Sequence, residues 1–214
     1  MKKDVTILDY GIGNLLSVSR AIHESGGIAN ITDDREKIAT ADYLILPGVG
    51  NFSLAIKELR DRGFEESILN HQSKERPLLG ICLGMQLFFD SSEEEGLHKG
   101  LGIISGSVKS IPTKNQSGFS HKIPHIGWSP LELNLKEDNE SKSILNDQHD
   151  GQFFYFIHSY QGHVDKAEEC IAITKYNDLN ITAVIQKNYA IGCQFHPEKS
   201  GENGIKFLKS FLSY

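Results

Sequence analysis

The chain has 214 residues, 39% of them hydrophobic and 23% charged, which is typical of a globular protein and argues against a disordered or fibrous one. Its formal net charge is −6 and it has no long cluster of Lys and Arg, which argues against a nucleic-acid-binding protein. No apolar run approaches the roughly 20 residues that cross a bilayer, so we expect no membrane contact.

The three cysteines are an odd number and form no C-x-x-C pair, which argues against a disulfide scaffold or a zinc ribbon. Cys170 and Cys193 lie in strand-like segments and are expected to be small buried hydrophobes. Residues 1–4 run directly into a strand-like segment and do not resemble a signal peptide. We therefore expect a reducing, cytoplasmic location and one domain over residues 1–214.

In the first half of the chain, short apolar strands alternate with amphipathic helices. In chain order we expect strands over residues 5–8, 43–46 and 77–81, and helices over residues 15–25, 52–62 and 84–90. This alternation predicts an α/β fold with a largely parallel sheet that is covered by helices on both faces. The pair Gly11 and Gly13 lacks the third glycine of a dinucleotide-binding loop, so we interpret it as a tight turn.

After Gly100 the strand-like segments follow one another, over residues 107–111, 153–158, 170–175, 182–186 and 190–195. Residues 113–122 and 135–150 are polar and are expected to be loops, and a last helix is expected over residues 202–212. The predicted sheet is therefore mixed and mostly parallel, flanked by helices, with an antiparallel extension. The acidic run Glu93–Glu95 is most simply a solvated loop or helix end.

A nucleophile candidate lies between the third strand and the helix that follows it, in Gly80-Ile-Cys82-Leu-Gly84. A sharp strand-to-helix turn strains the central residue and leaves no room for bulky neighbours, which explains glycine at both flanking positions. The turn exposes the sulfur at the edge of the sheet, beside a helix N-terminus that favours the thiolate. The N–H of Leu83 would point the same way and could bind an oxyanion. The alternative is a buried structural cysteine.

A base candidate ends the last strand, in Gln194-Phe-His196-Pro-Glu198. In an extended segment residues i and i+2 project to the same side, so the carboxylate of Glu198 could bind one ring nitrogen of His196 and leave the other free. Pro197 restricts the backbone between them. A surface histidine beside an acid is the alternative, and spacing alone does not bring His196 to Cys82. No His, Asp and Glu cluster has metal-ligand spacing, so we expect neither a metal nor a cofactor.

Together, Gly80-Ile-Cys82-Leu-Gly84-Met-Gln86 and Gln194-Phe-His196-Pro-Glu198 resemble the motifs of the class I (triad) glutamine amidotransferases. One branch of that family, the glutaminase subunits of imidazole glycerol phosphate synthase, is similar over nearly the whole chain. The further matching segments are Pro47-Gly-Val-Gly50 followed by Phe52, Pro124-His-Ile-Gly-Trp128, Tyr155-Phe-Ile-His-Ser-Tyr160 and His196-Pro-Glu-Lys-Ser-Gly201. The resemblance implies a flavodoxin-like fold.

The resemblance also implies a role for each matching residue. Cys82 attacks the side-chain amide of glutamine, His196 transfers the proton to departing ammonia, Glu198 orients His196, and water hydrolyses the thioester. The oxyanion hole would come from the backbone N–H groups of Leu83 and of the Val49 and Gly50 stretch. The glutamine-binding residues would be Gly50, Gln86, His158, Ser159 and Tyr160.

The implied partner is a (β/α)₈-barrel cyclase that receives the ammonia through a tunnel. The complex would convert a phosphoribulosyl-formimino aminoimidazole carboxamide ribotide into imidazole glycerol phosphate and an aminoimidazole carboxamide ribotide, a step of histidine biosynthesis. The implied partner-facing residues are Asn14, Trp128, Tyr155 and Lys199. For Trp128, the only tryptophan, the residues themselves leave interface and core equally open.

The chain departs from the family pattern near the expected interface, where Ile126 and Ser129 stand in place of Met and Asn. One alternative is therefore a paralogous glutaminase that supplies ammonia for amidino groups on surface sugars. A second alternative is a cysteine hydrolase of peptides or γ-glutamyl chains on the same fold. A third is a regulatory module without catalysis, against which the intact Cys82, His196 and Glu198 argue.

Overall fold

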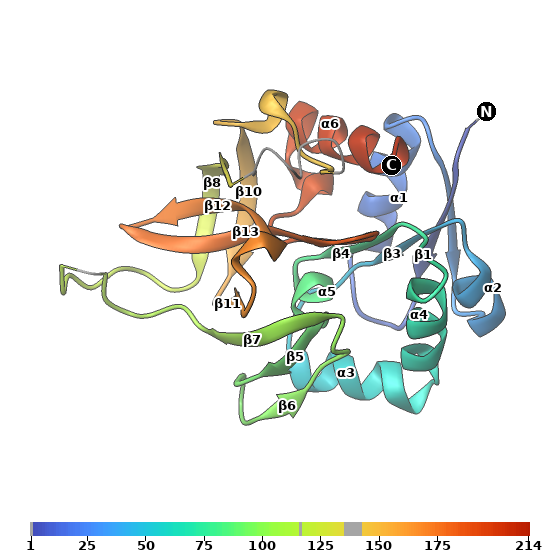
Figure 1. Ribbon diagram of the computed structural model, residues 1–214, viewed down its shortest axis with the longest axis horizontal. Coiled ribbons are helices and arrows are strands. Elements are labelled where there is room, and N and C mark those ends of the chain that lie inside the picture. The colour runs from blue at the N-terminus through green and yellow to red at the C-terminus, as the bar shows by residue number, and fades with distance from the viewer. Residues whose placement is uncertain (1, 116, 135–142) are drawn as a thin grey trace.

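The computed structural model describes residues 2–115, 117–134 and 143–214, and Figure 1 shows the course of the chain. The strands are β1 (Asp4–Leu8), β2 (Ile28–Thr32), β3 (Tyr43–Leu46), β4 (Leu78–Ile81), β5 (Phe89–Ser92), β6 (His98–Lys99), β7 (Ile104–Ser110), β8 (His125–Pro130), β9 (Glu132–Leu133), β10 (Phe153–His158), β11 (Tyr160–Val164), β12 (Cys170–Tyr176), β13 (Leu179–Lys187) and β14 (Ala190–Cys193). The α-helices are α1 (Leu15–Glu24), α2 (Arg35–Thr40), α3 (Phe52–Asp61), α4 (Phe64–Gln72), α5 (Leu83–Gln86) and α6 (Gly201–Leu212), and the 3₁₀-helices are η2 (Asp147–His149), η3 (Ala167–Glu169) and η4 (Pro197–Lys199).

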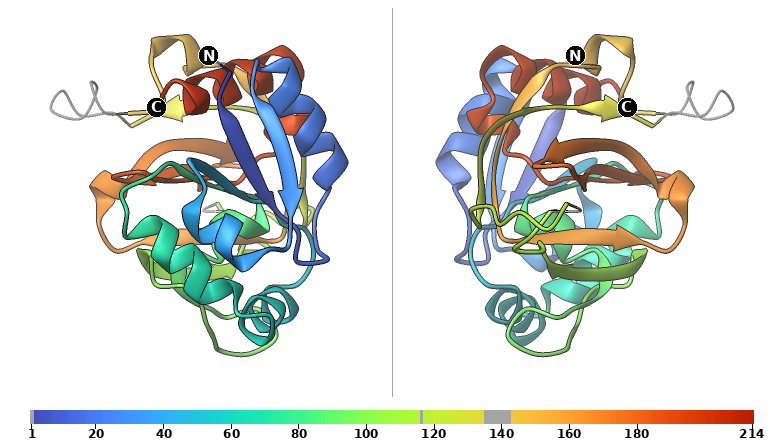
Figure 2. Two further views of the ribbon diagram at one scale, coloured as in Figure 1. Left: turned by 90° about the vertical axis from the view of Figure 1, so that its right-hand side faces the viewer. Right: turned by 90° about the vertical axis from the view of Figure 1, so that its left-hand side faces the viewer.

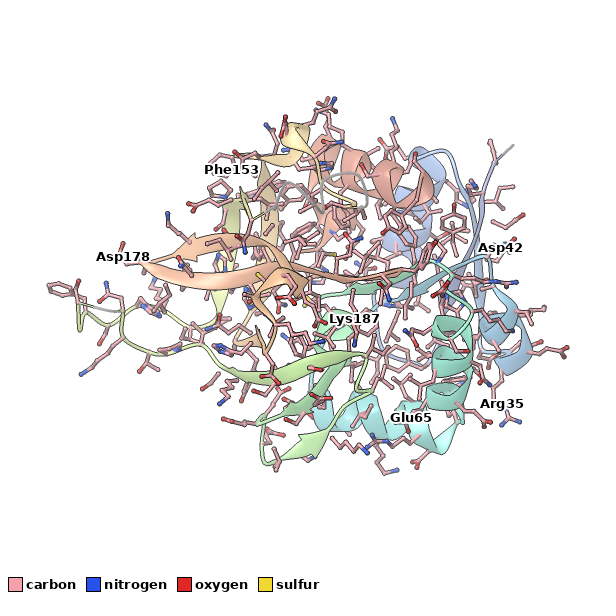
Figure 3. The ribbon with its side chains drawn as sticks, viewed as in Figure 1. Arg35, Asp42, Glu65, Phe153, Asp178 and Lys187 are labelled. Atoms are coloured by element: carbon pink, nitrogen blue, oxygen red, sulfur yellow. The ribbon has the colours of Figure 1, made fainter. Side chains whose placement is uncertain are left out.

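An eight-stranded sheet with the order β2-β1-β3-β4-β14-β13-β12-β9 forms the centre of the molecule. Its first five strands are parallel, and β13, β12 and β9 continue it antiparallel. The mixed, mostly parallel sheet with an antiparallel extension is thus confirmed. The hairpin of β12 and β13 projects from the body of the molecule, and Asp178 marks its tip in Figure 3.

Two apolar cores lie on the two faces of this sheet. One contains the buried side chains of α1 and α6, including Val18, Ile22 and Phe207. The other contains those of α2, α3 and α4, including Ile38 and Phe52. Figure 2 shows the two helical layers in side view. The strands between them, such as β3, are buried at every position, as expected for parallel strands that are covered on both faces.

Side-chain caps fix the starts of two helices on the second face. The carboxylate of Asp34 accepts hydrogen bonds from the N–H groups of Glu36 and Lys37 at the start of α2. The side-chain oxygen of Asn51 accepts one from the N–H of Leu54 at the start of α3. Such caps satisfy N–H groups that have no partner inside the helix. The start of α3 matters for function because it follows directly on the loop of residues 47–50.

The expected helix over residues 84–90 is wrong in most of its length. The helix α5 ends at Gln86, and Phe89 begins strand β5, which pairs with β7. The apolar run Leu87 to Phe89 is completely buried, and such a run fits a strand as well as a helix, so periodicity could not decide between them.

The strands β7 and β10 do not belong to the central sheet. The strand β7 lies in a four-stranded sheet with the order β11-β7-β5-β6, and among the described strands β10 pairs with β8 alone. The expected antiparallel extension of the central sheet is therefore correct for β12 and β13 and wrong for these two segments, whereas β14 pairs parallel with β4 and antiparallel with β13. Of the expected loop over residues 135–150, residues 135–142 lie outside the described residues. No helix in the described part of the chain is long and apolar enough to span a membrane.

Candidate active site

Cys82 lies between β4 and α5 in a strained backbone conformation, with φ 54° and ψ −107°. A residue other than glycine in a sparsely populated conformation of this kind costs on the order of 1–3 kcal/mol, so the surrounding structure must hold it. Two hydrogen bonds do so: the N–H of Cys82 donates to the carbonyl oxygen of Cys193 at 2.8 Å, and its own carbonyl accepts from the N–H of Gln86 at 3.2 Å.

The glycines on either side of Cys82 are required by close backbone contacts. A Cβ atom on Gly84 would lie 1.9 Å from the carbonyl oxygen of Leu46, and one on Gly80 would lie 2.7 Å from backbone atoms of Gly84 and Met85. The short helix α5 therefore packs directly on β3 and β4 with no side chain between them. The predicted reason for the two glycines is confirmed.

The base and its carboxylate are joined as predicted, but by the 3₁₀-helix η4, which begins directly after His196, and not by the expected extended segment. The Nδ1 atom of His196 and the Oε1 atom of Glu198 are 2.7 Å apart, and both side chains are almost completely buried. Since a carboxylate oxygen only accepts, the proton of this bond is on Nδ1, and Nε2 is the free nitrogen. The N–H of His196 donates to the carbonyl oxygen of Tyr155, which fixes the backbone behind the ring.

Cys82 and His196 line the same cavity. Burial alone lowers the pKa of His196, but the nearby Cys82 and Glu198 outweigh it and raise this pKa from 6.5 to about 10. A histidine ring near a sulfur is the arrangement in which the ring can act as the base of a cysteine nucleophile. Cys82 and His196 are 114 residues apart along the chain, and the fold places them, with Glu198, as a nucleophile, a base and an orienting carboxylate would lie.

A cavity of about 330 Å³ opens over the sulfur. All the residues predicted for the oxyanion hole and for glutamine binding line it: Val49, Gly50, Leu83, Gln86, His158, Ser159 and Tyr160. Leu83 is the first residue of α5, so its N–H has no acceptor within the helix. Among the described residues, no group of three His, Cys, Asp or Glu side chains could hold a metal ion.

The loop that carries Val49 and Gly50 packs tightly against the start of α5. A Cβ atom on Gly48 would lie 2.8 Å from the hydroxyl oxygen of Tyr10 and 2.9 Å from the Cβ of Leu83. The hydroxyl of Tyr10 donates to the carbonyl oxygen of Pro47 at 2.8 Å, and burial together with the charge of Cys82 raises the pKa of Tyr10. Gly50 adopts φ +100° with open space around it, a conformation that glycine adopts without strain.

Glu94 is a site residue that sequence reasoning missed. The acidic run Glu93–Glu95 was interpreted as solvated, but Glu94 is half-buried and lines the cavity. Its carboxylate accepts a hydrogen bond from the N–H of Phe52 at 2.8 Å, and burial raises its pKa. Sequence reasoning could not tell which of these three acids turns inward, because a contact with Phe52, 42 residues away along the chain, decides it.

Two buried histidines stand behind the cavity. The Nδ1 atom of His158 donates to the carbonyl oxygen of Tyr160 at 2.8 Å, and its Nε2 atom is 3.0 Å from Nδ1 of His125. Nε2 of His125 is in turn 2.9 Å from the hydroxyl of Ser129. Burial lowers the pKa of His158 to about 3 and that of His125 to about 4, so both rings are neutral near pH 7. Ser129 therefore points inward.

Three of the four residues predicted to face a partner lie together beside the cavity. Trp128 and Tyr155 are direct neighbours across β8 and β10, with ring centroids 6.0 Å apart, and the ammonium of Lys199 lies 6.0 Å from the ring of Tyr155. Trp128 is 54% exposed, so it is not a core residue. Asn14 precedes α1, which packs against η4, the helix that carries Lys199.

Comparisons with known proteins agree with the fold and with the motifs. Residues 6–213 match the family model for glutamine amidotransferase class-I. The imidazole glycerol phosphate synthase subunit HisH 1 of Legionella pneumophila (strain Lens) is 43% identical over 208 residues, which cover 97% of this chain and 98% of that protein. The subunit HisH of Caldanaerobacter subterraneus subsp. tengcongensis is 45% identical over 207 residues, with 97% and 96% covered.

Solved structures resemble the chain at much lower identity. The structure of PurLQS from Thermotoga maritima superimposes with a TM-score of 0.72 at 17% identity, over 100% of this chain and 99% of that one. A crystal structure of a glutamine amidotransferase gives a TM-score of 0.72 at 17% identity, over 98% and 99%. These two likenesses concern the fold alone.

Proposed function

The chain belongs to the class I glutamine amidotransferases, among the HisH subunits of imidazole glycerol phosphate synthase, and from this membership we propose how it hydrolyses glutamine to glutamate and ammonia. The observation that carries the proposal is that Cys82 and His196 line one cavity and that His196 is hydrogen-bonded to Glu198. The ammonia is used by a cyclase subunit in histidine biosynthesis.

In the first step the thiolate of Cys82 attacks the side-chain carbonyl carbon of glutamine and forms a tetrahedral oxyanion. The N–H groups of Leu83 and of the Val49 and Gly50 stretch stabilise that oxyanion, and one such donor is typically worth on the order of 10²–10³ in rate. The imidazolium of His196 then gives its proton to the departing nitrogen, and ammonia leaves a γ-glutamyl thioester on the sulfur. The carboxylate of Glu198 stabilises the charged ring throughout.

In the second step His196 removes a proton from water, which attacks the thioester carbonyl. The bond to the sulfur breaks, glutamate leaves, and the thiolate–imidazolium pair is restored. A positioned base of this kind contributes about 10²–10⁴ in rate.

The cavity also holds groups suited to the other end of the substrate. The carboxylate of Glu94 would bind the α-ammonium group of glutamine, which no other acidic side chain in the cavity lining could do. Both N–H groups of the Gln86 amide are used within the protein, so its remaining polar atom, Oε1, is an acceptor for the substrate. Gly50 and the backbone around His158, Ser159 and Tyr160 would complete the site.

We further propose that an apolar face on β8 and β10 binds the cyclase, and that this partner is a (β/α)₈ barrel. Alternating residues of the two paired strands project on one side, and their exposed members are Ile126, Trp128, Phe153 and Ile157. Figure 3 labels Phe153 at the start of β10. Exposed apolar groups clustered in this way mark an interaction surface, and aromatic residues are enriched at interface cores.

The apolar face reaches the cavity, since Lys199 lines the cavity and lies over Tyr155, which is on the same face. A partner bound there would cover the cavity and keep the ammonia from water, where it would be protonated. Of the two departures from the family pattern, only Ile126 lies on this face, because Ser129 points inward to His125. The surface is thus altered at one position, and the similarity to HisH subunits over 97% of the chain supports histidine biosynthesis over the amidino-sugar alternative. We also propose that the protein is one domain and acts in the cytoplasm, where its three free thiols would stay reduced.

A glutamine-like diazo ketone tests the nucleophile directly. The chain, mixed with its cyclase, should lose glutaminase activity with covalent labelling at Cys82, and free glutamine should protect it. Labelling elsewhere, or loss of activity without labelling at Cys82, would remove this residue as the nucleophile.

A further inference from the structure

Gln194 contacts the sulfur of Cys82 and has no part in the steps above. Its side-chain nitrogen Nε2 lies 3.7 Å from Sγ, and the residue is completely buried. It is two residues before His196, in the bend that links β14 to η4. The N–H of Gln194 donates to the carbonyl oxygen of Ala183, which anchors its backbone to the neighbouring strand β13.

The carbonyl oxygen of Tyr160 determines how the Gln194 amide is oriented, through the side chain of Gln86 that lies between them. The carbonyl oxygen of Tyr160 can only accept, so the Gln86 atom that lies 3.1 Å from it must be the nitrogen. The second N–H of that nitrogen donates to Oε1 of Gln194 at 3.0 Å. With its oxygen committed to Gln86, the amide of Gln194 turns its NH₂ group toward the sulfur. The reverse orientation would place two NH₂ groups against each other.

The sulfur has a second polar neighbour with the opposite preference. The carbonyl oxygen of Ile157 lies 4.0 Å from Sγ and would accept a proton from a neutral thiol. The N–H of Gln194 is closer and favours the ionised sulfur, because a hydrogen bond to an ionised acceptor is about twice as strong as a neutral one. Since Gln194 is fully buried, it faces the sulfur without competition from bulk water.

From this geometry we propose that Gln194 is a further catalytic residue, which donates a hydrogen bond to the sulfur of Cys82 and stabilises the thiolate before attack and whenever it leaves. Gln86 is then a positioning residue as well as a substrate ligand, since it holds the Gln194 amide in the donating orientation. The inference rests on the proposed role of Cys82 as the nucleophile.

Two variants separate a role at the sulfur from a role in packing. Gln194→Met keeps the length of the side chain and removes both polar atoms. Gln194→Glu keeps an oxygen that accepts from Gln86, so it retains the buried contact, and replaces the donor with a negative charge beside the sulfur. The readout is the rate at which iodoacetamide alkylates Cys82 in the full chain bound to its cyclase, followed by mass spectrometry from pH 5 to pH 10.

In both variants the pH of half-maximal alkylation should rise, and alkylation of Cys82 at pH 7 should slow by about tenfold, more in Gln194→Glu than in Gln194→Met. Glutaminase kcat should fall with it, while KM for glutamine changes little. If both variants keep the wild-type pH dependence of alkylation and only their melting temperatures fall, Gln194 is a packing residue and the inference is wrong. If Gln194→Met does not fold, Gln194→Glu alone decides between these results. Failure of the wild-type chain to react at Cys82 would instead refute the proposed nucleophile.

Discussion

Replacing Gly84 with Ala places a methyl group where the helix α5 touches the strand β3. The added carbon would lie 1.9 Å from the carbonyl oxygen of Leu46 and 2.9 Å from its carbonyl carbon. The closest ordinary approach of a carbon to such an oxygen is about 3.3 Å, so the two segments must separate by roughly 1.4 Å. Both are backbone, and no side-chain rotation relieves the contact. Leu46 leads directly into the loop of residues 47–50, so the displacement reaches the predicted oxyanion hole.

Overpacking of a buried site costs about 1–3 kcal/mol and sometimes more, and a clash with backbone belongs at the upper end. A loss of about 3 kcal/mol lowers the melting temperature of a protein of this size by roughly 6–12 °C. A misplacement of about 1 Å at a catalytic group costs on the order of 10² in rate. We therefore expect Gly84→Ala to lose both stability and glutaminase kcat, measured by thermal unfolding and by glutamate release in the complex.

Gly151→Ala is the matched control. Gly151 has φ +66° and no neighbour within 4 Å of an added carbon, so the variant isolates the backbone cost, roughly 1–2 kcal/mol. Gly84, by contrast, has no left-handed φ. Gly84→Ala should be the less stable of the two and the only one with reduced kcat. Equal melting temperatures and equal kcat values would refute the argument from close packing.

Three further predictions concern single side chains. Glu198→Gln removes one of the two groups that raise the pKa of His196, and the new amide can donate to Nδ1 of His196 and enforce the wrong tautomer. Glutaminase kcat should therefore fall by about 10²–10⁴, and a kcat within twofold of wild type would contradict the orienting role. Glu94→Gln keeps an oxygen that accepts from the N–H of Phe52 but loses the negative charge. The KM for glutamine should therefore rise by at least about tenfold with little change in kcat. An unchanged KM would show that Glu94 does not bind the substrate. Trp128→Ala should raise the Kd for the cyclase by about 30-fold, measured by titration calorimetry. The melting temperature should not change, because the side chain is 54% exposed. A lower melting temperature with an unchanged Kd would instead identify a structural role.

The sequence predicts most of the central sheet and the floor of the site. Backbone strain at Cys82 and the backbone contacts of Gly80 and Gly84 produce a local pattern that is visible in the chain itself. His196 and Glu198 are two residues apart, so their contact could be predicted from their spacing, although a 3₁₀-helix and not the expected extended segment makes it. Elements that rest on short-range rules of this kind were correctly predicted, among them β3, α3 and α6.

The features that were missed depend on contacts between distant segments. Leu87 to Phe89 is buried all around, so its hydrophobicity carries no period that separates strand from helix. Glu94 accepts from the N–H of Phe52, 42 residues away along the chain, whereas Glu93 pairs with Lys109 and Glu95 with Asn51. Gln194 forms part of a recognisable motif, but its contact with Cys82 spans 112 residues and depends on how Gln86 and Tyr160 are placed.

Substitution of the nucleophile is the most direct test of the central claim. In the complex with the cyclase, Cys82→Ala should abolish turnover that depends on glutamine and leave turnover with added ammonium salt at the wild-type rate, since the chain then supplies only a seal and not the nitrogen. Retention of glutamine-dependent turnover, or loss of both activities in a folded complex, would contradict the proposal that Cys82 performs the glutaminase chemistry.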